Sequence, residues 1–510
     1  MLPVRFCENM KALLKDEYEA FIAGYESESC KALRLNPLKT GKAQFLALSL
    51  FHLCPVPWED MGFYYSEEDF PGKHPLHEAG VYYIQEPSAM YPVNLLFEDD
   101  MQDPESPDPL HSDQPLTILD LCAAPGGKTT QIAGRMKGRG VLVANEIHQK
   151  RAEILSENIE RLGVTNALVL NETPDRLEKR FPGYFNRILV DAPCSGEGMF
   201  RKNEEAVKEW SPENVEMCAK RQDDILDKAV TMLKYGGILV YSTCTFNKEE
   251  DEDCIGRLLS RHEDLKFICE KKLYPHRIEG EGQYAAKLVK IGPRGGSSGH
   301  LQPSKLSVRK NALPFLKIFE GFARENLIND GDYVSESGAL NGQAVRPKAP
   351  NGQEVRSEAP NGQEVRPGEV PHDDGMLPLA LRVFNDLKKY GGITCGEPIA
   401  FGDNLYIAPE GFTDLGGLKC LRPGLHLGSI KKGRFEPSHA LALTLKPENV
   451  KRYVNLTDPE SAESYLKGMT FYHEGEKGFH LICAEGYSLG WGKLAGNIMK
   501  NHYPKGLRRV

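Results

Sequence analysis

Between residues 117 and 288, short apolar runs alternate with segments whose apolar residues recur at helical spacing. This alternation predicts a mostly parallel, doubly wound sheet, an α/β fold whose ligands bind at the carboxyl ends of the strands. We expect strands at Thr117–Leu121, Gly140–Asn145, Ala167–Leu170, Arg187–Val190 and Ile238–Tyr241. We expect helices at Lys128–Met136, His148–Leu162 and Asp223–Leu233.

Two cysteines follow two of these strands directly. Cys194 lies in Asp191-Ala-Pro-Cys-Ser-Gly, and Cys244 lies in Tyr241-Ser-Thr-Cys-Thr. Because parallel strands deliver the residues after them to one edge of the sheet, both thiols are expected at the ligand-binding edge. Two cysteines in such turns indicate thiol chemistry on one substrate, whereas the other cysteines are more typical of small buried residues.

A glycine turn follows the first strand. The run Leu121-Cys-Ala-Ala-Pro-Gly-Gly-Lys-Thr lets backbone N–H groups approach a ligand, but it is neither a Walker A loop nor a GxGxxG motif. Glu146 ends the second strand, where a carboxylate can hold ribose hydroxyls. A generic strand–helix turn with a solvated glutamate is the alternative interpretation.

Composition narrows the class of protein. The chain has 510 residues, of which 40% are hydrophobic and 26% charged, which favours roughly two to four domains. No apolar run approaches the roughly 18 residues of a membrane span, and the N-terminus lacks the apolar region of a signal peptide. The twelve cysteines form no CxxC pair, so no metal is expected. We expect a cytoplasmic protein with reduced thiols.

Charge is unevenly distributed. The net charge is −9, and acidic residues concentrate in patches such as Glu249–Asp253. From residue 493 onward there is no acidic residue, and five basic ones could contact phosphate: Lys493, Lys500, Lys505, Arg508 and Arg509.

The rest of the chain divides by composition. Residues 1–75 contain an amphipathic helical pattern over Met10–Ala23, and an acidic, proline-rich segment follows at Glu98–Pro115. Residues 341–370 repeat a polar ten-residue unit three times, which indicates a disordered spacer rather than a solenoid. Glycine turns between short alternating runs predict a small β-rich domain near the C-terminus.

Three long motifs carry a family resemblance. They are Cys-Ala-Ala-Pro-Gly-Gly-Lys-Thr from Cys122, Asp-Ala-Pro-Cys-Ser-Gly-Glu-Gly from Asp191, and Tyr-Ser-Thr-Cys-Thr-Phe from Tyr241. In order and spacing they resemble the RsmB/RsmF (Nop/Sun) group of RNA cytosine-5 methyltransferases. Gln85-Glu-Pro-Ser-Ala-Met and the C-terminal Gly490-Trp-Gly-Lys are also similar to this group, in particular to its RsmF-type members, which methylate 16S ribosomal RNA.

The resemblance implies a chemistry. Cytosine C5 is a weak nucleophile until a thiolate adds to C6, after which it can take the methyl group of S-adenosyl-L-methionine. By resemblance, Cys244 is the nucleophile and Cys194 helps to resolve the adduct. Asp191 would bind the N3/N4 edge of the base, and Lys128 would contact the base or the cofactor. The implied cofactor-binding set is Cys122, Ala123, Ala124, Pro125, Gly126, Gly127, Lys128, Glu146, Asn171, Thr173 and Asp191.

One position departs from the family pattern. The group usually has an aspartate after the third strand to contact adenine, but here the run is Leu170-Asn-Glu-Thr-Pro-Asp. Ungapped spacing selects Thr173, whereas Asn171 is the better chemical substitute, so both stay open. Trp210 is expected in the core, and Trp491 either in the core or as an RNA-facing platform.

The resemblance also implies the architecture. We expect an N-terminal α+β RNA-binding extension (1–75), a Rossmann-like class I methyltransferase core (76–291), a largely disordered linker (292–375) and a C-terminal β-rich PUA-like RNA-binding domain (376–510). The expected partner is 16S rRNA or the small ribosomal subunit, bound by a monomer without membrane or metal. The alternatives are a tRNA cytosine-5 methyltransferase, a DNA cytosine-5 methyltransferase, which would lack the Thr-Cys partner, and a catalytically silent ribosome-assembly factor.

Overall fold

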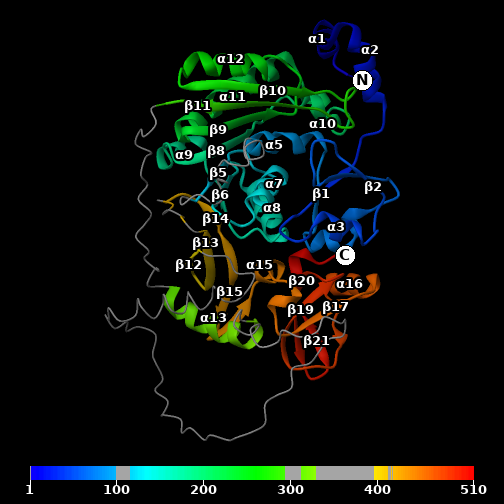
Figure 1. Ribbon diagram of the computed structural model, residues 1–510, viewed down its shortest axis with the longest axis vertical. Coiled ribbons are helices and arrows are strands. Elements are labelled where there is room, and N and C mark those ends of the chain that lie inside the picture. Colours follow the sequence, from blue (N-terminus) through cyan, green and yellow to red (C-terminus); the bar gives the residue numbers. More distant parts are fainter. Residues whose placement is uncertain are drawn as a thin grey trace, which may run out of the picture.

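The computed structural model describes residues 2–98, 115–292, 312–328, 396–409, 411, 415 and 417–509. Figure 1 shows the central sheet with the N-terminal sheet beside it and the C-terminal sheets below. Within these ranges no helix has the length and apolar character that crossing a membrane would require. The acidic segment, except for its ends, and the three decapeptide repeats lie outside the described residues.

The central sheet has the strand order β10-β11-β9-β8-β5-β6-β7-β14. Its middle strands β5 to β9 run parallel, and the outer three are antiparallel to their neighbours. The strands are β5 (Thr117–Asp120), β6 (Val141–Asn145), β7 (Ala167–Leu170), β8 (Phe185–Asp191), β9 (Leu233–Thr243), β10 (Leu265–Leu273), β11 (Gln283–Lys290) and β14 (Cys420–Pro423).

Helices cover both faces because the strands are apolar on both sides. Leu119 and Val143 face a cluster shared with α9 (Pro174–Arg180), α11 (Pro212–Met232) and α12 (Glu252–Arg261). Ile118 and Leu142 face the opposite cluster, shared with α5 (Tyr91–Phe97), α7 (Gly127–Met136) and α8 (Gln149–Arg161). The predicted α/β fold with a mostly parallel, doubly wound sheet is therefore confirmed.

Two local predictions differ from the structure. The helix expected from Asp223 begins at Pro212, because Ser211 caps it by accepting a hydrogen bond from the Asn214 amide. The amphipathic stretch Met10–Ala23 is split between α1 (Val4–Leu14) and α2 (Tyr18–Glu26), because Lys15 adopts a φ of 52°. Both helices contribute to an aromatic cluster with Trp210, which is buried as expected.

The N-terminal sheet has the order β2-β3-β1-β4. It comprises β1 (Ala32–Leu35), β2 (Leu53–Pro55), β3 (Gly62–Tyr65) and β4 (Tyr82–Ile84), with the short helices α3 (Lys42–Leu46) and α4 (Pro75–Glu78).

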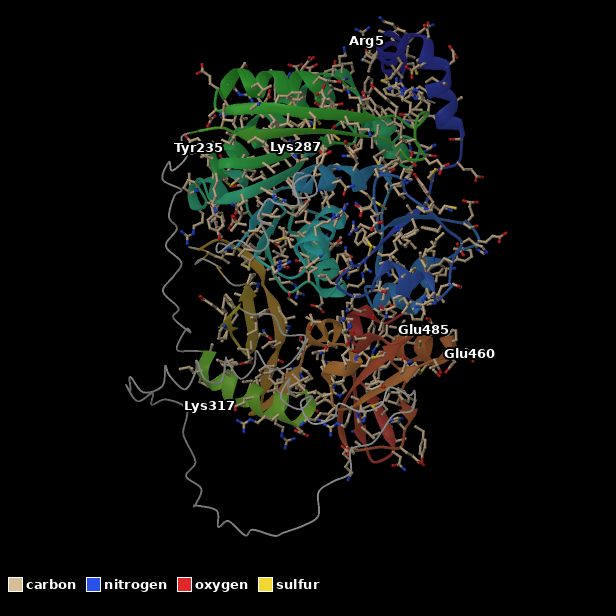
Figure 2. All side chains as sticks on the ribbon, viewed as in Figure 1. Arg5, Tyr235, Lys287, Lys317, Glu460 and Glu485 are labelled. Atoms are coloured by element: carbon tan, nitrogen blue, oxygen red, sulfur yellow. The ribbon has the colours of Figure 1, made fainter. Side chains whose placement is uncertain are left out.

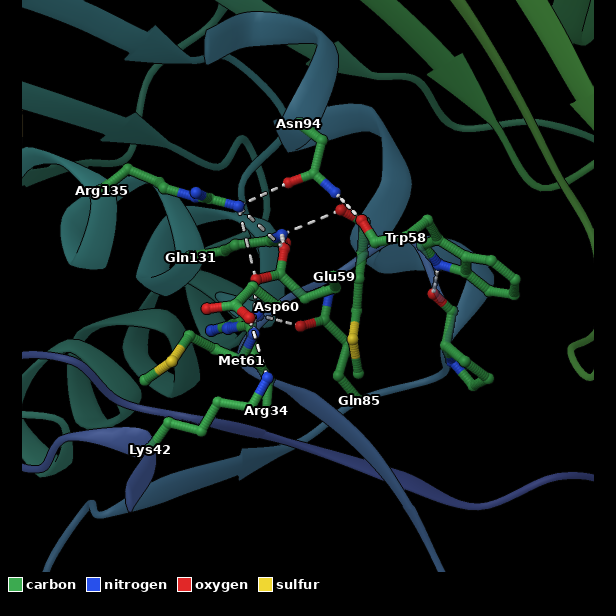
Figure 3. A network of polar contacts seen from close by, with 12 residues as sticks. Arg34, Lys42, Trp58, Glu59, Asp60, Met61, Gln85, Asn94, Gln131 and Arg135 are labelled. Atoms are coloured by element: carbon green, nitrogen blue, oxygen red, sulfur yellow. Dashed lines mark hydrogen bonds and ion pairs between the residues drawn. The ribbon is translucent and has the colours of Figure 1, made fainter. Parts of the chain in front are cut away.

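A buried polar network joins this sheet to α7 (Figure 3). Arg34 donates to the Gly127 carbonyl at 2.9 Å and to the Thr130 hydroxyl at 2.8 Å. Glu59 accepts a hydrogen bond from Gln131 at 2.6 Å. Arg34 and Glu59 are 3% and 2% exposed, so the N-terminal extension is fastened directly to the helix that starts at the glycine turn.

The C-terminal part contains two sheets of its own, ordered β12-β13-β15-β16 and β17-β19-β20-β21-β18. Their strands are β12 (Gly396–Phe401), β13 (Asn404–Pro409), β15 (Leu425–Lys431), β16 (Arg434–Pro437), β17 (Tyr453–Leu456), β18 (Phe471–Tyr472), β19 (Gly478–Ala484), β20 (Tyr487–Ala495) and β21 (Ile498–Asn501). Helices α15 (His439–Thr444) and α16 (Pro459–Leu466) accompany them. β14 does not join these sheets but pairs with β7 of the central sheet.

An ordered helix lies inside the range that we assigned to the linker. It is α13 (Leu313–Asn326), whose Phe319 and Phe322 pack against Phe435 with ring centroids 5.0 Å apart. Lys317, on the other side of this helix, is exposed (Figure 2). Trp491 belongs to the same cluster and is 2% exposed, so of its two predicted places it occupies the core.

The basic residues of the C-terminal tail have different surroundings. Lys493, Lys500 and Lys505 are exposed. Arg509 instead forms ion pairs with Glu78 at 3.2 Å and Glu463 at 2.8 Å. Its guanidinium therefore ties the tail to α4 and α16 and is engaged within the protein.

Candidate active site

The two thiols meet at the carboxyl ends of β8 and β9. These parallel neighbours pair Asp191 with Ser242, so the residues that follow leave the sheet side by side. Cys194 Sγ and Cys244 Sγ lie 3.3 Å apart, and both cysteines are free and half-buried. The contact joins residues 50 positions apart in the sequence, as the strand positions suggested.

Asp191 and Lys128 form an ion pair beside the thiols. The Lys128 ammonium lies 2.8 Å from Asp191 Oδ2, and the Ser242 hydroxyl donates to Asp191 Oδ1 at 2.7 Å. Gln283 approaches Oδ1 at 3.5 Å. Although burial disfavours its charged form, the Asp191 carboxylate raises the pKa of Lys128 above its usual value. The carboxylate is thus oriented by three donors from three elements.

The two thiols differ in their surroundings. Contact with the Cys244 thiol and burial raise the pKa of Cys194 well above its usual value. The Cys194 thiol therefore holds its proton more firmly than a free cysteine does. Cys122 lies in the glycine turn, where burial raises its pKa far above that of a free cysteine, so this residue is not a reactive thiolate.

The glycine turn is held in place by α8. Arg151 donates to the Ala124 carbonyl at 2.8 Å, and Asn158 donates to the Pro125 carbonyl at 2.9 Å. The backbone of Ala123 donates to the Asn145 carbonyl at 2.8 Å. Gly126 has a φ of 113°, a left-handed conformation that favours glycine, and α7 begins at the next residue. The amide groups in the first turn of an α-helix have no partner within the helix, so those of α7 are donors that a ligand could use.

Glu146 and Asn171 line the neighbouring strand ends. Glu146 is 3% exposed, and its Oε1 accepts the His148 amide at 2.9 Å. The Asn171 side chain donates to the Glu146 and Ile147 carbonyls at 2.8 Å, and its oxygen accepts from Lys419. Asn171 is therefore fully used in shaping the loop, whereas Thr173 stands half-buried at the N-cap of α9 without a capping hydrogen bond from its side chain.

Several residues beside these positions were missed in the sequence. Ser242 and Gln283 orient Asp191, and the pairing of Ser242 with Asp191 follows from aligning the two strand ends. Asp120 ends β5 fully buried, where burial raises its pKa to about 7. Its Oδ1 atom lacks a hydrogen-bond partner within the described parts of the chain. No signal in the sequence distinguished it from an ordinary strand-end aspartate.

Among the described residues, no group of three or more histidine, cysteine, aspartate or glutamate side chains could hold a metal ion. The site instead combines two thiols, an ion pair and a glycine turn at one sheet edge. This set of groups suits covalent catalysis with a nucleotide-like ligand.

Comparison with known proteins identifies the family. A model for the 16S rRNA methyltransferase RsmB/F matches residues 109–289. Ribosomal RNA small subunit methyltransferase F of Vibrio vulnificus is 30% identical over 100% of this chain and 98% of its own length. This chain belongs to the RsmB/F family of rRNA methyltransferases. Ribosomal RNA small subunit methyltransferase F of Erwinia tasmaniensis is 35% identical over 57% of this chain and 63% of its own length.

Other family models match the remaining parts. The N-terminal domain of 16S rRNA methyltransferase RsmF matches residues 2–87, the first C-terminal domain of RsmF matches 386–445, and the RsmF PUA domain matches 452–509. The PUA model thus corresponds to the sheet from β17 to β21 only. The crystal structure of PH0851 shares the fold, with a TM-score of 0.51 and 24% identity over 57% of this chain and 66% of that chain.

Proposed function

We propose that this RsmB/F-family methyltransferase methylates C5 of cytosine in 16S rRNA through a covalent adduct between Cys244 and C6. The observation that carries the proposal is the pair of thiols 3.3 Å apart, with the Asp191–Lys128 ion pair beside them. One thiol can add to the base while the other, whose pKa is raised by the first thiol and by burial, handles a proton.

The bonds balance as follows. The Cys244 thiolate attacks C6, and the electrons of the C5=C6 bond take the methyl group. Bound S-adenosyl-L-methionine would supply that methyl group, with its sulfonium becoming an uncharged thioether. Cys194 first passes its own proton to solvent and, as the thiolate, then removes the proton from C5. The C5=C6 bond re-forms, and the bond between Cys244 and C6 breaks to release the Cys244 thiolate. The Asp191 carboxylate would accept hydrogen bonds from the N3/N4 edge of the base, favour the N3-protonated form of the base and so favour the first addition.

Residues of this chain fit the methyl donor. Glu146 at the end of β6 can accept hydrogen bonds from ribose hydroxyls, and the amides after Gly126 can meet a carboxylate or other anionic group. The unpartnered Oδ1 atom of buried Asp120 offers a further acceptor at this edge. The Thr173 hydroxyl makes no capping bond to α9, whereas the Asn171 amide is engaged, so we favour Thr173 of the two for the adenine side.

We also propose that different segments of the chain carry out catalysis and RNA binding. Residues 76–291 carry the chemistry, while 1–75 and 376–510 bind RNA on either side of it. Support comes from the N-terminal sheet fastened to α7 and from three exposed lysines near the C-terminus, Lys493 in β20, Lys500 in β21 and Lys505 after the sheet. The protein is proposed to act in the cytoplasm on 16S rRNA or on the small subunit.

Methyl transfer to purified RNA, with radiolabelled donor, tests the proposal. Transfer to 16S rRNA or to the small subunit, with the label at cytosine C5, is the expected result. Transfer only to tRNA would move the substrate to the first alternative, and binding without transfer would indicate an assembly factor.

The two thiols give a sharper test. Cys244→Ala should form neither adduct nor product, whereas Cys194→Ala should accumulate protein bound to RNA that survives denaturation. Cys218→Ala, in a buried thiol of α11, is a matched control that should behave as wild type. Adduct in Cys244→Ala and none in Cys194→Ala would reverse the assignment.

A further inference from the structure

Each cysteine turn is braced by a buried carboxylate that the other turn supplies. Glu250 lies six positions after Cys244, yet its Oε2 accepts the amide of Ser195, the residue after Cys194, at 3.0 Å. Glu197 lies three positions after Cys194, yet its Oε2 accepts the amide of Phe246, just beyond Cys244, at 3.0 Å. The two turns therefore hold each other through crossed hydrogen bonds.

Further contacts fix the Cys194 turn on both sides. The Gln222 side chain, from α11, donates to Glu250 Oε2 at 2.9 Å and to the Pro193 carbonyl at 3.0 Å. The backbone groups immediately before and after Cys194 are thus bound to one Glu250–Gln222 pair. Both side chains are 0% exposed, so water does not compete for these bonds.

The Cys244 turn is fixed in a similar way. The second oxygen of Glu197 accepts from the Trp210 indole at 3.1 Å, and Glu197 is 1% exposed. The Gly198 amide donates to the Cys244 carbonyl at 2.9 Å. The Ser195 and Thr245 hydroxyls, one from each turn, lie 3.0 Å apart and join the two turns directly.

Such carboxylates are costly to bury, which indicates that their position matters. Burial raises the pKa of Glu197 above its usual value and that of Glu250 to about 7. Both carboxylates bond to backbone amides that neighbour the cysteines rather than to the thiols themselves, so each acts through the backbone of its turn. Their role is positioning rather than direct participation in a reaction step.

We propose that Glu250 and Gln222 position Cys194 for release of the methylated base, whereas Glu197 positions Cys244 for attack on it. This inference rests on the proposed function and assigns each half of that reaction its own supporting residues. A displacement of about 1 Å in a reacting group can cost on the order of a hundredfold in rate, so a loosened turn should be visible in kinetics. Loss of Glu250 or Gln222 should consequently slow release of the methylated base, whereas loss of Glu197 should slow the attack on it.

Single-turnover and steady-state methyl transfer, with denaturing gels for the adduct, distinguish the two roles. Glu250→Ala should transfer the first methyl group near the wild-type rate, turn over about tenfold or more slowly, and accumulate adduct. Glu197→Ala should lose about tenfold or more in the first methyl transfer and accumulate none. A merely structural role would lower both rates together in both variants.

Conservative variants add a second readout. Glu250→Gln keeps the acceptor for the Ser195 amide, since only Oε2 is used, and should restore turnover. Glu197→Gln should rescue poorly, because both oxygens of Glu197 accept hydrogen bonds. Gln222→Met removes the bond to Pro193 without emptying the site, so it tests the same idea if Glu250→Ala does not fold. Glu216→Ala, on the exposed side of α11, is the control.

Cys194→Ala on the same gel distinguishes failure of the positioning roles from failure of the covalent mechanism. If Cys194→Ala traps adduct but Glu250→Ala and Gln222→Met release product at the wild-type rate, the crossed braces are refuted and the proposed function stands. If Cys194→Ala itself traps nothing, the covalent mechanism fails and the assignment of the braces fails with it.

Discussion

Replacing Gly126 by alanine tests the turn before α7 through its backbone alone. At a φ of 113° an alanine is strained, and its Cβ would lie 3.2 Å from Leu155 Cδ1 and 3.5 Å from Asn158 Cβ of α8. The strain and the contact together should cost about 2 kcal/mol. Because the added carbon points toward α8, the expected effect comes from distortion of the turn rather than from a blocked approach of the ligand.

This cost in free energy can appear either in the stability of the protein or in its affinity for the methyl donor. If the turn keeps its shape, the free energy of unfolding falls by about 2 kcal/mol; if it relaxes, restoring it on binding weakens methyl-donor affinity by roughly thirtyfold. The bulkier Gly126→Val should lose at least about tenfold in affinity. Calorimetric titration and thermal unfolding measure the two quantities on the same protein.

Gly127→Ala is the matched control. Its Cβ would meet Tyr83 at 3.4 Å and Gln85 at 3.5 Å, which is ordinary contact, and the residue already has helical geometry. We expect near wild-type stability and affinity for this variant. Equal behaviour of the two alanine variants in both assays would refute the argument from backbone conformation.

The remaining predictions concern charge, pH and the linker. Neutralising the exposed Lys493, Lys500 and Lys505 should weaken RNA binding and flatten its dependence on log salt, whereas Arg509→Gln should mainly lower the melting temperature; an unchanged salt slope in the lysine variant would exclude phosphate contact. Burial raises the pKa of Glu250 from 4.5 to about 7, so the folded protein retains a proton that the unfolded chain has lost. Stability should therefore fall as pH rises through this window, by up to about 3 kcal/mol, and Glu250→Gln should remove that part of the slope in urea titrations at several pH values. Deleting residues 341–370 should leave melting temperature and turnover nearly unchanged, because the repeats are polar and poor in large apolar residues; a marked loss of either would show that they pack.

The sequence is most informative where a pattern is local. Strand–helix alternation predicts β5 to β8 within about two residues, and β7 at Ala167–Leu170 to the residue. β9 instead begins at Leu233, well before the strand expected from Ile238. The meeting of Cys194 and Cys244 follows from one general property, that parallel strands end at a common edge. Their separation of 3.3 Å depends in addition on the turns that follow the strands, which Glu250 and Glu197 hold through backbone amides.

Long-range partners are not predictable in the same way. The acidic stretch Glu249–Asp253 indicates only a charged patch, yet Glu250 and Asp251 are 0% exposed. Glu250 accepts from the Ser195 amide, and Asp251 accepts from Thr243 and pairs with Lys272. Composition alone does not reveal that the Ser195 amide lies opposite Glu250. Likewise, the sequence suggests Asn171 as a ligand contact, whereas Lys419 and two carbonyls occupy its amide in the structure.

The pairing of β14 with β7 bears on how fragments of this protein should be interpreted. Lys419, next to β14, bonds through its backbone with both Asn171 and Glu172, so residues from the C-terminal part help to form the loop on the methyl-donor side. A fragment that stops before residue 376 would lose this support and expose the edge of β7. An exposed strand edge can pair with another chain, so such a fragment should tend to aggregate. Inactivity of such a fragment would thus report on the shape of the donor pocket as much as on RNA affinity.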